Sequence, residues 1–378
     1  MSNLELLKKL IEIESVSPND NGCFEVIKKE FDGLNFSFKE TKYKNISNLI
    51  ITNGNSKNKT FCFLGHTDVV PPGPESEWTV PPFSGEIVDN KIYGRGAADM
   101  KGGVSCFISA LKEFLLDYKN PNFNIMILLN SNEEGKLENG KVDRVINEMI
   151  ENGQFIDFCL IGEPSSSKQV GDVIRIGRRG SLSGNLKVFG IQGHVAYPKQ
   201  ALNPILGIGK TLEDLKNMEW DHGNENFDPT SFQVSNIKSG TGAENVVPGL
   251  LEMSFNFRFS PESSPEQLKE KFETVLNKSK MKYEVNWTLS ALPFLTSKTD
   301  FIDIVRSAIK DINNVDTKID NGGGTSDGRW VAPMGSEIVE LGPLNKTIHQ
   351  IDEHVDIEDL NTLKEIYKKI LIKVHQSA

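Results

Sequence analysis

Histidines and carboxylates of this chain follow short apolar runs, at points where buried strands would end. His66 and Asp68 come directly after the run FCFLG, and the adjacent pair Glu133 and Glu134 lies just beyond NIMILLN. Two neighbouring carboxylates repel each other, so they need a cation or a proton to lie side by side. Asp68 is placed to hold a metal-bound His66 imidazole through its second nitrogen. Taken singly, a loop histidine and a solvated turn explain these residues equally well.

Three more positions extend this pattern. Asp99 lies in GRGAADMKGG, ahead of a helical stripe, where a helix N-cap is the alternative interpretation. Glu163 follows the apolar run CLIG, and His349 comes shortly after the run EIVELG. In open α/β sheets, ligands gather at the carboxyl ends of the strands. We therefore expect a cluster of histidines and carboxylates of the kind that binds zinc.

The elements that must position these residues alternate between strand and helix. Short apolar runs predict buried strands, and apolar residues at helical spacing predict the helices between them. This alternation favours the α/β class, with a mixed, mostly parallel sheet and helices on both of its faces. The predicted strands are 61–65, 124–130, 156–162 and 337–342, and the predicted helices are 102–117, 299–313 and about 357–374.

The pattern changes near residue 180, where the strands begin to look half-solvated. Their order with two helices is β-α-β-β-α-β, the split βαβ arrangement of a ferredoxin-like α+β domain with an antiparallel sheet. We predict a catalytic domain at 1–179 and 294–378, interrupted by an inserted dimerisation and lid domain at 180–293. The predicted strands of the insert are 182–192, 231–239, 250–259 and 282–290, and its helices are about 204–218 and 265–277.

Length and composition restrict the class of protein. A chain of 378 residues is too long for one ordinary core, which favours two domains. Its net charge of −10 disfavours a nucleic-acid or anionic-membrane surface as the main function. The N-terminus predicts an amphipathic helix rather than a signal peptide, and no apolar run is long enough to span a bilayer. The four cysteines show no CxxC pairing, so we expect a reducing, cytoplasmic location.

Over essentially its whole length the chain resembles the co-catalytic zinc aminoacylase and carboxypeptidase family, which is of the metallopeptidase type. It looks most like the bacterial members that remove succinate from N-succinyl-LL-2,6-diaminopimelate in lysine and diaminopimelate biosynthesis. One motif would carry little weight, but ten occur in the family's order. They are GHTDVVPPG, WTVPPF, IYGRGAADMKGG, SNEEG, IGEPSS, GRRGSL, QGHVAYP, ENVVPG, GGGTSDGRW and LGPLNKTIH.

The resemblance implies two Zn²⁺ ions per subunit, with Co²⁺ able to substitute. Asp99 would bridge the two ions. One ion would also be bound by His66 and Glu163, and the other by Glu134 and His349. Such a ligand set leaves a position open for water, which is typical of catalytic rather than structural zinc sites.

The resemblance also implies roles in catalysis. Glu133 would be the general base for a metal-bridged hydroxide that hydrolyses the amide bond. Asp68 would assist as the partner of the His66 imidazole. His194, in QGHVAYP, would reach in from the partner subunit of a homodimer and stabilise the oxyanion. Its spacing alone gives His194 no reason to lie near the metals.

The implied substrate is a small polycarboxylate. Arginine forks suit carboxylates because two donors match two oxygens, and two arginines match family substrate positions. Two departures bear on substrate identity, because Glu244 and Asp352 stand where the family usually has asparagine. The substrate residues carried over by the resemblance are Arg178, Ser181, Tyr197, Asn245, Arg258, Gly324, Thr325, Ser326 and Asn345.

Two other functions compete with this one. A relative that deacylates acetylornithine or another N-acyl amino acid would keep the same metals and base, but GRRGSL, QGHVAYP and GGGTSDGR favour the succinyl compound. A catalytically inactive binding protein of the same fold is disfavoured. Such a protein has no chemical reason to keep Glu133 beside a complete set of metal ligands.

Overall fold

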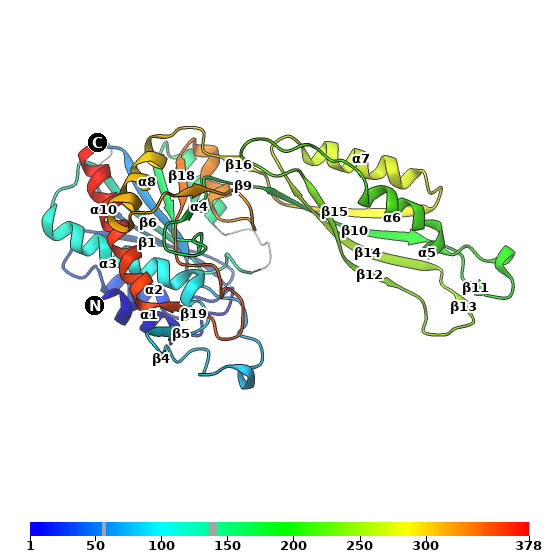
Figure 1. Cartoon of the computed structure of the whole chain (residues 1–378), viewed down its shortest axis with the longest axis horizontal. Helices are drawn as coiled ribbons and strands as arrows, with labels where there is room; N and C mark the ends of the chain where they lie inside the picture. The colour runs from blue at the N-terminus through cyan, green and yellow to red at the C-terminus, as the bar shows by residue number, and fades with distance from the viewer. Residues whose placement is uncertain (55–57, 136–141, 378) are drawn as a thin grey trace. The chain divides into compact units, whose positions relative to one another are not determined.

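The chain forms two compact units. The computed structural model describes residues 1–54, 58–135 and 142–377. Unit 1 comprises Met1–Gly177, Leu295–Asp320 and Ser326–Ala378, and unit 2 comprises Arg178–Phe294 and Asn321–Thr325 (Figure 1). The roles predicted for the two domains stay predictions.

Unit 1 is built on a six-stranded sheet with the order β1-β2-β6-β3-β7-β18. The four strands from β6 to β18 are parallel, and β1 and β2 are antiparallel to their neighbours. The mixed, mostly parallel sheet is therefore confirmed. The sequence analysis assigned no strand to the two antiparallel members. The bounds are Ser37–Tyr43 for β1, Ile46–Asn53 for β2, Thr60–His66 for β3, Asn124–Asn130 for β6, Phe158–Ile161 for β7 and Glu337–Glu340 for β18.

The central strands of unit 1 are buried on both faces, as parallel strands usually are. In β3, Phe61 and Phe63 belong to the core cluster that includes α3, α8 and α10, whereas Cys62 and Leu64 are buried outside that cluster. No helix among the described residues is long and apolar enough to cross a membrane. The helices of unit 1 are α1 (Asn3–Ile11), α2 (Cys23–Lys29), α3 (Gly102–Asp117), α4 (Val142–Glu151), α8 (Asp300–Asn313), α9 (Gly328–Val331) and α10 (Ile357–Ser377).

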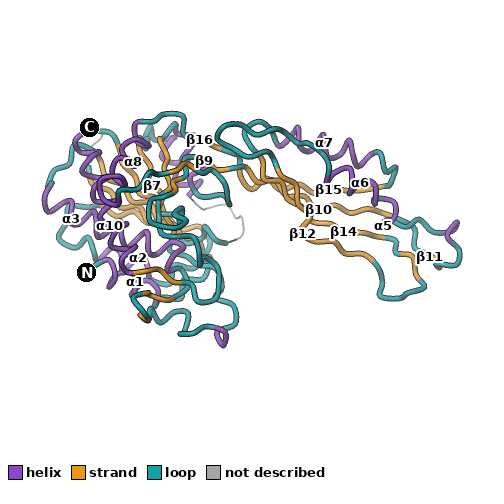
Figure 2. The backbone as a smooth tube through the Cα atoms, viewed as in Figure 1, coloured by secondary structure: helices purple, strands orange, loops and turns teal. Residues whose placement is uncertain are grey.

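Unit 2 is an antiparallel four-stranded sheet with the order β12-β14-β10-β15, and its helices cover one face (Figure 2). The chain order β-α-β-β-α-β is confirmed, except that the first helix is interrupted at Ile208. Burial alternates along β14, as expected when one face packs on a core and the other stays open. The bounds are β10 (Gly180–Phe189), α5 (Pro204–Gly207), α6 (Gly209–Lys216), β12 (Ser231–Ser239), β14 (Leu250–Phe259), α7 (Pro265–Asn277) and β15 (Lys282–Ala291).

Removing an aromatic ring from the core of unit 2 should destabilise it strongly. Phe272 of α7 is 0% exposed and stacks on Phe255 of β14 with ring centroids 4.4 Å apart. We expect Phe272→Ala to lower the free energy of unfolding by about 3–5 kcal/mol in denaturant titrations followed by circular dichroism. Leu250→Ala, at a 38% exposed position of the same sheet, is the control and should cost far less. Equal losses would contradict this assignment of the core.

Candidate metal centre

One group of ligand atoms converges at the carboxyl end of β3. His66 is the last residue of this strand and is 1% exposed. Its Nε2 lies 3.4 Å from Oδ1 of Asp99 and 3.6 Å from Oε1 of Glu163, which follows β7, the next strand of the sheet. Three elements distant in the sequence thus bring one nitrogen and two carboxylate oxygens together.

A second group shares Asp99 with the first. His349 Nε2 lies 3.3 Å from the other carboxylate oxygen of Asp99, Oδ2, and 2.7 Å from Oε1 of Glu134. Glu134 follows the end of β6, and His349 lies in the loop between β18 and β19 (His354–Asp356). Each oxygen of the Asp99 carboxylate therefore faces a different histidine.

The donor atoms fit metal ions. Nε2 of His66 and Oδ1 of Asp99 are buried and have no hydrogen-bond partner among the described residues, although buried polar atoms rarely stay unsatisfied. Atoms from His66, Asp99 and Glu134 lie within 4.8 Å of one another, and so do atoms from His66, Glu133 and Glu163. Imidazole nitrogens and carboxylate oxygens are ligands that zinc accepts.

The backbone around Asp99 serves to present its carboxylate. Asp99 does not cap a helix, because α3 begins at Gly102 and its N-cap position is Lys101. Asp99 instead lies in the irregular segment η2 (Ala97–Lys101), and the Asp99–Met100 peptide bond is cis. A Cβ atom added at Gly103 would come within 2.4 Å of the Gly162 carbonyl oxygen. This glycine thus lets α3 approach the segment that carries Glu163.

Asp68 holds the segment that carries the two adjacent glutamates. Its Oδ1 accepts a hydrogen bond from the Glu133 N–H at 3.0 Å, and its Oδ2 accepts one from the Glu134 N–H at 3.1 Å. The Ser17 hydroxyl also donates to Oδ2. Nδ1 of His66 lies 2.9 Å from the carbonyl oxygen of Asp68 and 3.6 Å from its carboxylate. Asp68 therefore orients both the histidine and the glutamate pair.

The carboxylates change the proton affinity of both histidines. Burial by itself would lower the pKa of His66, but the Asp99 and Glu163 carboxylates outweigh it and hold that pKa well above its ordinary value. Contacts with Asp99 and Glu134 raise the pKa of His349 to about 10. Protons thus occupy the histidines of the metal-free protein at neutral pH, and a metal ion must displace them.

Glu133 is held in surroundings that favour its protonated form. Burial raises the pKa of its carboxyl well above the usual range, and the nearby carboxylates of Asp327 and Glu163 raise it further. Asp327 is itself 3% exposed and accepts a hydrogen bond from Asn130 at the end of β6. A carboxyl with a raised pKa is suited to receive and return a proton near neutral pH.

The predicted substrate residues of unit 2 form two separate groups. In the first, Ser181 of β10 lies opposite Arg258 of β14, and Arg178 donates to the Gly324 carbonyl at 3.1 Å. Burial lowers the pKa of Arg258, and the neighbouring Arg179 and Arg178 add to this effect. Positive charge is therefore concentrated at one end of the sheet, beside Gly324 and Thr325.

The second group lies beyond the opposite end of the same sheet. β11 (Gly193–His194) pairs with β13 (Val246–Val247), and the Val195 N–H donates to the Asn245 carbonyl at 3.1 Å. His194 is exposed, and its ring centroid is 5.7 Å from that of Tyr197. His194, Tyr197 and Asn245 thus lie together, and Glu244 beside them is exposed.

The last two predicted substrate residues belong to unit 1. Ser326 is 0% exposed, and its hydroxyl donates to Oε1 of Glu340 at 2.5 Å. The Asn345 N–H donates to the Ser166 carbonyl at 2.9 Å, and the Asn345 side chain is partly exposed. Asn345 is therefore the more accessible of the two.

Comparisons with known proteins agree on one family. The model of peptidase family M20/M25/M40 matches residues 62–373. The chain belongs to this family. It is similar to succinyl-diaminopimelate desuccinylase from Methylococcus capsulatus, at 48% identity over 97% of both chains. The desuccinylase from Hydrogenovibrio crunogenus is 47% identical over 98% of both chains.

Solved structures of related architecture share the fold. The M20 family metallo-carboxypeptidase from Sulfolobus solfataricus superposes with a TM-score of 0.83 at 19% identity, covering 100% of both chains. A tripeptidase from Staphylococcus aureus reaches a TM-score of 0.79 at 22% identity, covering 99% of this chain and 98% of that one. At such identities the likeness supports the fold and says nothing of the substrate.

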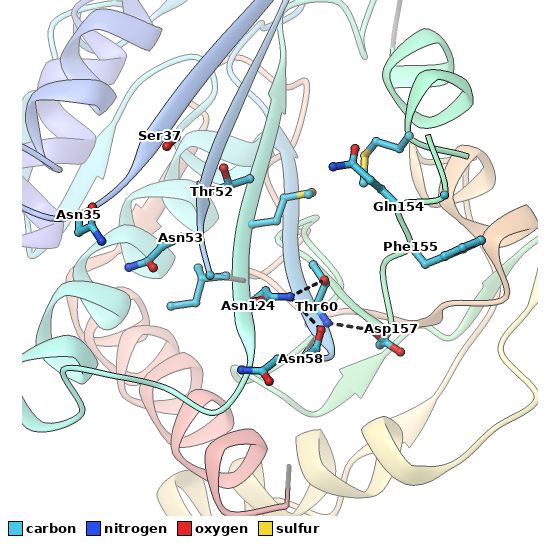
Figure 3. A pocket seen from close by; sticks show the side chains of 15 residues that line it. Asn35, Ser37, Thr52, Asn53, Asn58, Thr60, Asn124, Gln154, Phe155 and Asp157 are labelled. Carbon is cyan, nitrogen blue, oxygen red and sulfur yellow. Dashed lines mark hydrogen bonds between the residues drawn. The ribbon is translucent and has the colours of Figure 1, made fainter. Parts of the chain in front are cut away.

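A cavity at the opposite end of the sheet strands is lined by neither Glu133 nor any of the proposed metal ligands. It has a volume of about 600 Å³, and residues at the amino-terminal ends of β3 and β6 line it (Figure 3). It therefore lies at the end of β3 opposite the end that carries His66. Amides such as Asn53 and Asn124 line it. The carboxylate of Asp157, also in its wall, accepts a hydrogen bond from the Thr60 N–H at 2.8 Å. This M20 protein therefore has its candidate catalytic groups at the opposite sheet edge.

Three residues near the metal ligands escaped the sequence analysis. They are Ser17, which donates to Asp68, Asp327, which faces Glu133, and Glu353, which accepts from the Asp99 N–H. Glu353 had a signal in the sequence because it follows His349 closely, and Asp327 had one because it lies in the motif GGGTSDGRW. Ser17 had none, because it lies far along the chain from Asp68.

The metal-free protein should lose stability as the pH rises above neutrality. The pKa of His349 is raised from about 6.5 when unfolded to about 10 when folded. Its proton stabilises the fold below the lower value, and this contribution is lost as the pH rises through the higher one. We expect the Tm of chelator-treated protein to fall between about pH 6.5 and pH 10.

Bound zinc should abolish most of this dependence, because the cation takes the place of the protons. The heat of zinc binding should accordingly vary with the ionisation enthalpy of the buffer. His349→Gln is the control, since it removes one of the proton-binding groups and should make the fall in Tm smaller. A metal-free Tm that rises over this pH interval would contradict the assignment.

Proposed function

We propose that this protein hydrolyses N-succinyl-LL-2,6-diaminopimelate to succinate and LL-2,6-diaminopimelate. The curated relatives with 45–48% identity over at least 97% of the chain are desuccinylases of this kind. The observation that carries the proposal is the Asp99 carboxylate, whose two oxygens face His66 and His349 at 3.4 and 3.3 Å. Such sharing suits a pair of metal ions, which we propose to be Zn²⁺ with Co²⁺ as a substitute.

The described residues have distinct tasks in this reaction. When bound, the metal ions lower the pKa of a water molecule and polarise the amide carbonyl. His66, Glu163 and Asp99 would hold one ion, and Glu134, His349 and Asp99 the other.

Glu133 would accept the proton of the attacking water. The water oxygen bonds to the carbonyl carbon, the C–N bond breaks, and the proton passes from the Glu133 carboxyl to the leaving nitrogen. Asp68 holds this glutamate in place by accepting a hydrogen bond from its backbone N–H.

The arginine group of unit 2 supports a substrate with several carboxylates. The Arg258 guanidinium lies on β14 beside Arg178 and Arg179, and its pKa is lowered by burial and by these two neighbouring cations. A carboxylate relieves the repulsion among these cations, and a guanidinium can hold it with two parallel hydrogen bonds. An N-acetyl amino acid lacks the terminal carboxylate of a succinyl group and would leave this positive charge less well matched.

Activity measurements separate the proposed reaction from its rivals. For zinc-loaded protein we expect kcat/KM on N-succinyl-LL-2,6-diaminopimelate to exceed that on N-acetylornithine by roughly 10²–10⁴-fold. Glu133→Gln should lower kcat about 10²–10⁴-fold while zinc stoichiometry stays unchanged, because the base is lost and the proposed ligands remain.

Two results would change the proposal. Hydrolysis of the acetyl compound alone would keep the mechanism and overturn the substrate. If neither compound is hydrolysed by protein that holds zinc, the inactive binding protein becomes the better reading.

We propose further that the protein acts as a homodimer. Ser181, opposite Arg258, lies near one end of β10, and Phe189 is the last residue at the other end. The groups around Arg258 and His194 are therefore separated by roughly 25 Å or more within one unit 2. One small substrate cannot touch both groups of the same rigid unit. A partner subunit could supply the His194 group to complete the site, with His194 as the oxyanion donor.

The surface of unit 2 suggests where a second copy binds. Val234 and Ile237 of β12 lie opposite Phe255 and Met253, so they belong to the helix-covered face of the sheet. They are nevertheless 39% and 55% exposed, and β12 is an edge strand with unpaired backbone groups. Edge strands of this kind are commonly covered by another element or chain.

Disrupting this edge should separate the subunits. We expect Ile237→Asp to sediment as a monomer and to lose most desuccinylase activity, while its zinc content stays normal because all proposed ligands lie in unit 1. Leu289→Asp, at a 45% exposed position of the opposite edge strand β15, is the matched control and should stay dimeric. A wild-type protein that is fully active as a monomer would contradict the dimer proposal.

A further inference from the structure

Glu353 is a buried carboxylate that the proposed reaction does not use. It lies four residues after His349, immediately before β19, and is 0% exposed. Its Oε2 accepts hydrogen bonds from Nη1 of Arg95 at 2.7 Å and from the Gly96 N–H at 3.1 Å. A buried carboxylate with partners of this kind fixes the backbone around it.

The other oxygen of Glu353 reaches the residue that the two histidines share. Oε1 accepts hydrogen bonds from the Ala98 N–H at 2.9 Å and from the Asp99 N–H at 3.1 Å. One side chain thus binds three backbone N–H groups within the four residues that end at Asp99. Gly96 in this loop has a φ of 85°, a left-handed conformation that favours glycine.

The turn that carries Glu353 is itself anchored. His349 and Asp352 adopt φ values of 60° and 59°, which non-glycine residues rarely do without compensating contacts. The Asp352 carboxylate accepts hydrogen bonds from the N–H and the hydroxyl of Thr79, both at 2.7 Å. An asparagine at position 352 has only one side-chain oxygen to accept them. The Gly94 N–H also donates to the Glu353 carbonyl at 2.9 Å.

These contacts join two loops that are about 250 residues apart in the chain. One loop presents the Asp99 carboxylate, and the other presents the His349 imidazole, whose Nε2 lies 3.3 Å from Oδ2 of Asp99. Glu353 is the side chain that bonds directly to the backbone of the first loop from within the second. The spacing between the two ligand atoms therefore depends on it.

We propose that Glu353 is a positioning residue that sets the distance between Asp99 and His349. It would thereby determine how tightly the protein holds the metal ion that is proposed to bind Glu134, His349 and Asp99. This inference rests on the proposed metal centre. Groups that orient metal ligands typically change metal affinity by about 10- to 100-fold when they are replaced. Glu353 would act only through the Asp99 loop, without touching metal or substrate.

A purely structural role, as the ion-pair partner of Arg95, is the competing explanation. Glu353→Gln separates the two. Whichever way the amide is turned, its NH₂ group faces two donors, either those of Arg95 and Gly96 or those of Ala98 and Asp99. The side chain keeps its size, but the loop can no longer be held by two accepting oxygens.

We expect Glu353→Gln to weaken binding of one of the two Zn²⁺ ions, the one proposed for Asp99, Glu134 and His349, by about 10- to 100-fold in competition with a chromophoric chelator. The visible absorption of the Co²⁺-loaded protein should change as well, because it reports the geometry of the ligands. Glu337→Gln is the matched control. Glu337 is a 7% exposed glutamate of β18 that accepts from the Phe301 N–H at 2.8 Å, away from the metal ligands.

The control should lower the Tm of the metal-free protein and leave Zn²⁺ affinity and Co²⁺ absorption unchanged. A Glu353→Gln variant that shows the same pattern as the control would overturn the proposal. If this variant lacks the wild-type circular dichroism, Glu353→Asp replaces it. That variant keeps the charge, shortens the reach by one methylene and should also weaken metal binding.

The proposed function and the positioning role of Glu353 can be disproved separately. Wild-type protein that binds two Zn²⁺ ions but does not hydrolyse the succinyl compound would disprove the reaction and leave the role of Glu353 intact. Wild-type protein that binds no more than one Zn²⁺ ion would overturn the positioning role.

Discussion

The sharing of one carboxylate between two histidines is the interaction on which the rest of the structure depends. Asp99 offers one oxygen to each histidine, and burial alone would make its negative charge unfavourable. The histidines lower its pKa, and it raises theirs, so the three groups stabilise one another as ions. Protons can satisfy this arrangement in the absence of metal, and cations can replace them. The buried negative charge of the cluster is unfavourable unless protons or cations compensate it, and for the same reason the cluster can bind cations.

The fold maintains the cluster by taking each ligand from a different element. Strand order places the ends of β6, β3 and β7 side by side, which brings Glu134, His66 and Glu163 to one edge. The loop ligands need additional support, because loops have few neighbours of their own. Asp68 holds the backbone of the glutamate pair, and Glu353 holds the backbone before Asp99. Two buried carboxylates outside the proposed ligand set, those of Asp68 and Glu353, therefore bind the backbone that carries the proposed ligands.

Unit 2 carries the proposed recognition groups at both ends of one sheet. A strand of ten residues separates the arginines from the group around His194, so both groups serve a single substrate only if two chains cooperate. An edge strand with exposed apolar side chains on its core-facing side offers a surface for that purpose. The same sheet would then supply both the substrate's counter-charge and the contact between subunits.

Local sequence patterns were sufficient to predict most helices and strands. β12, β14 and α7 have the predicted bounds. For β14 and α7 the reason is local, because the alternation along β14 and the capping box at Ser264 each involve only a short segment. The ligand residues could be proposed from their positions after apolar runs and from motif order. β1 was missed because it is an exposed edge strand without an apolar alternation. The break at Ile208 was missed because helical spacing continues across it.

The sequence by itself determined which residues could bind metal and in which class of fold they would lie. Only the tertiary structure decided which oxygen faces which histidine, that Asn321–Thr325 clusters with unit 2, and that Glu353 and Asp327 lie beside the ligands. The physical reason is that strand and helix signals arise from neighbours within a few residues. Contacts such as that between Asp99 and Glu353 span some 250 residues and exist only once the sheet has brought distant loops together.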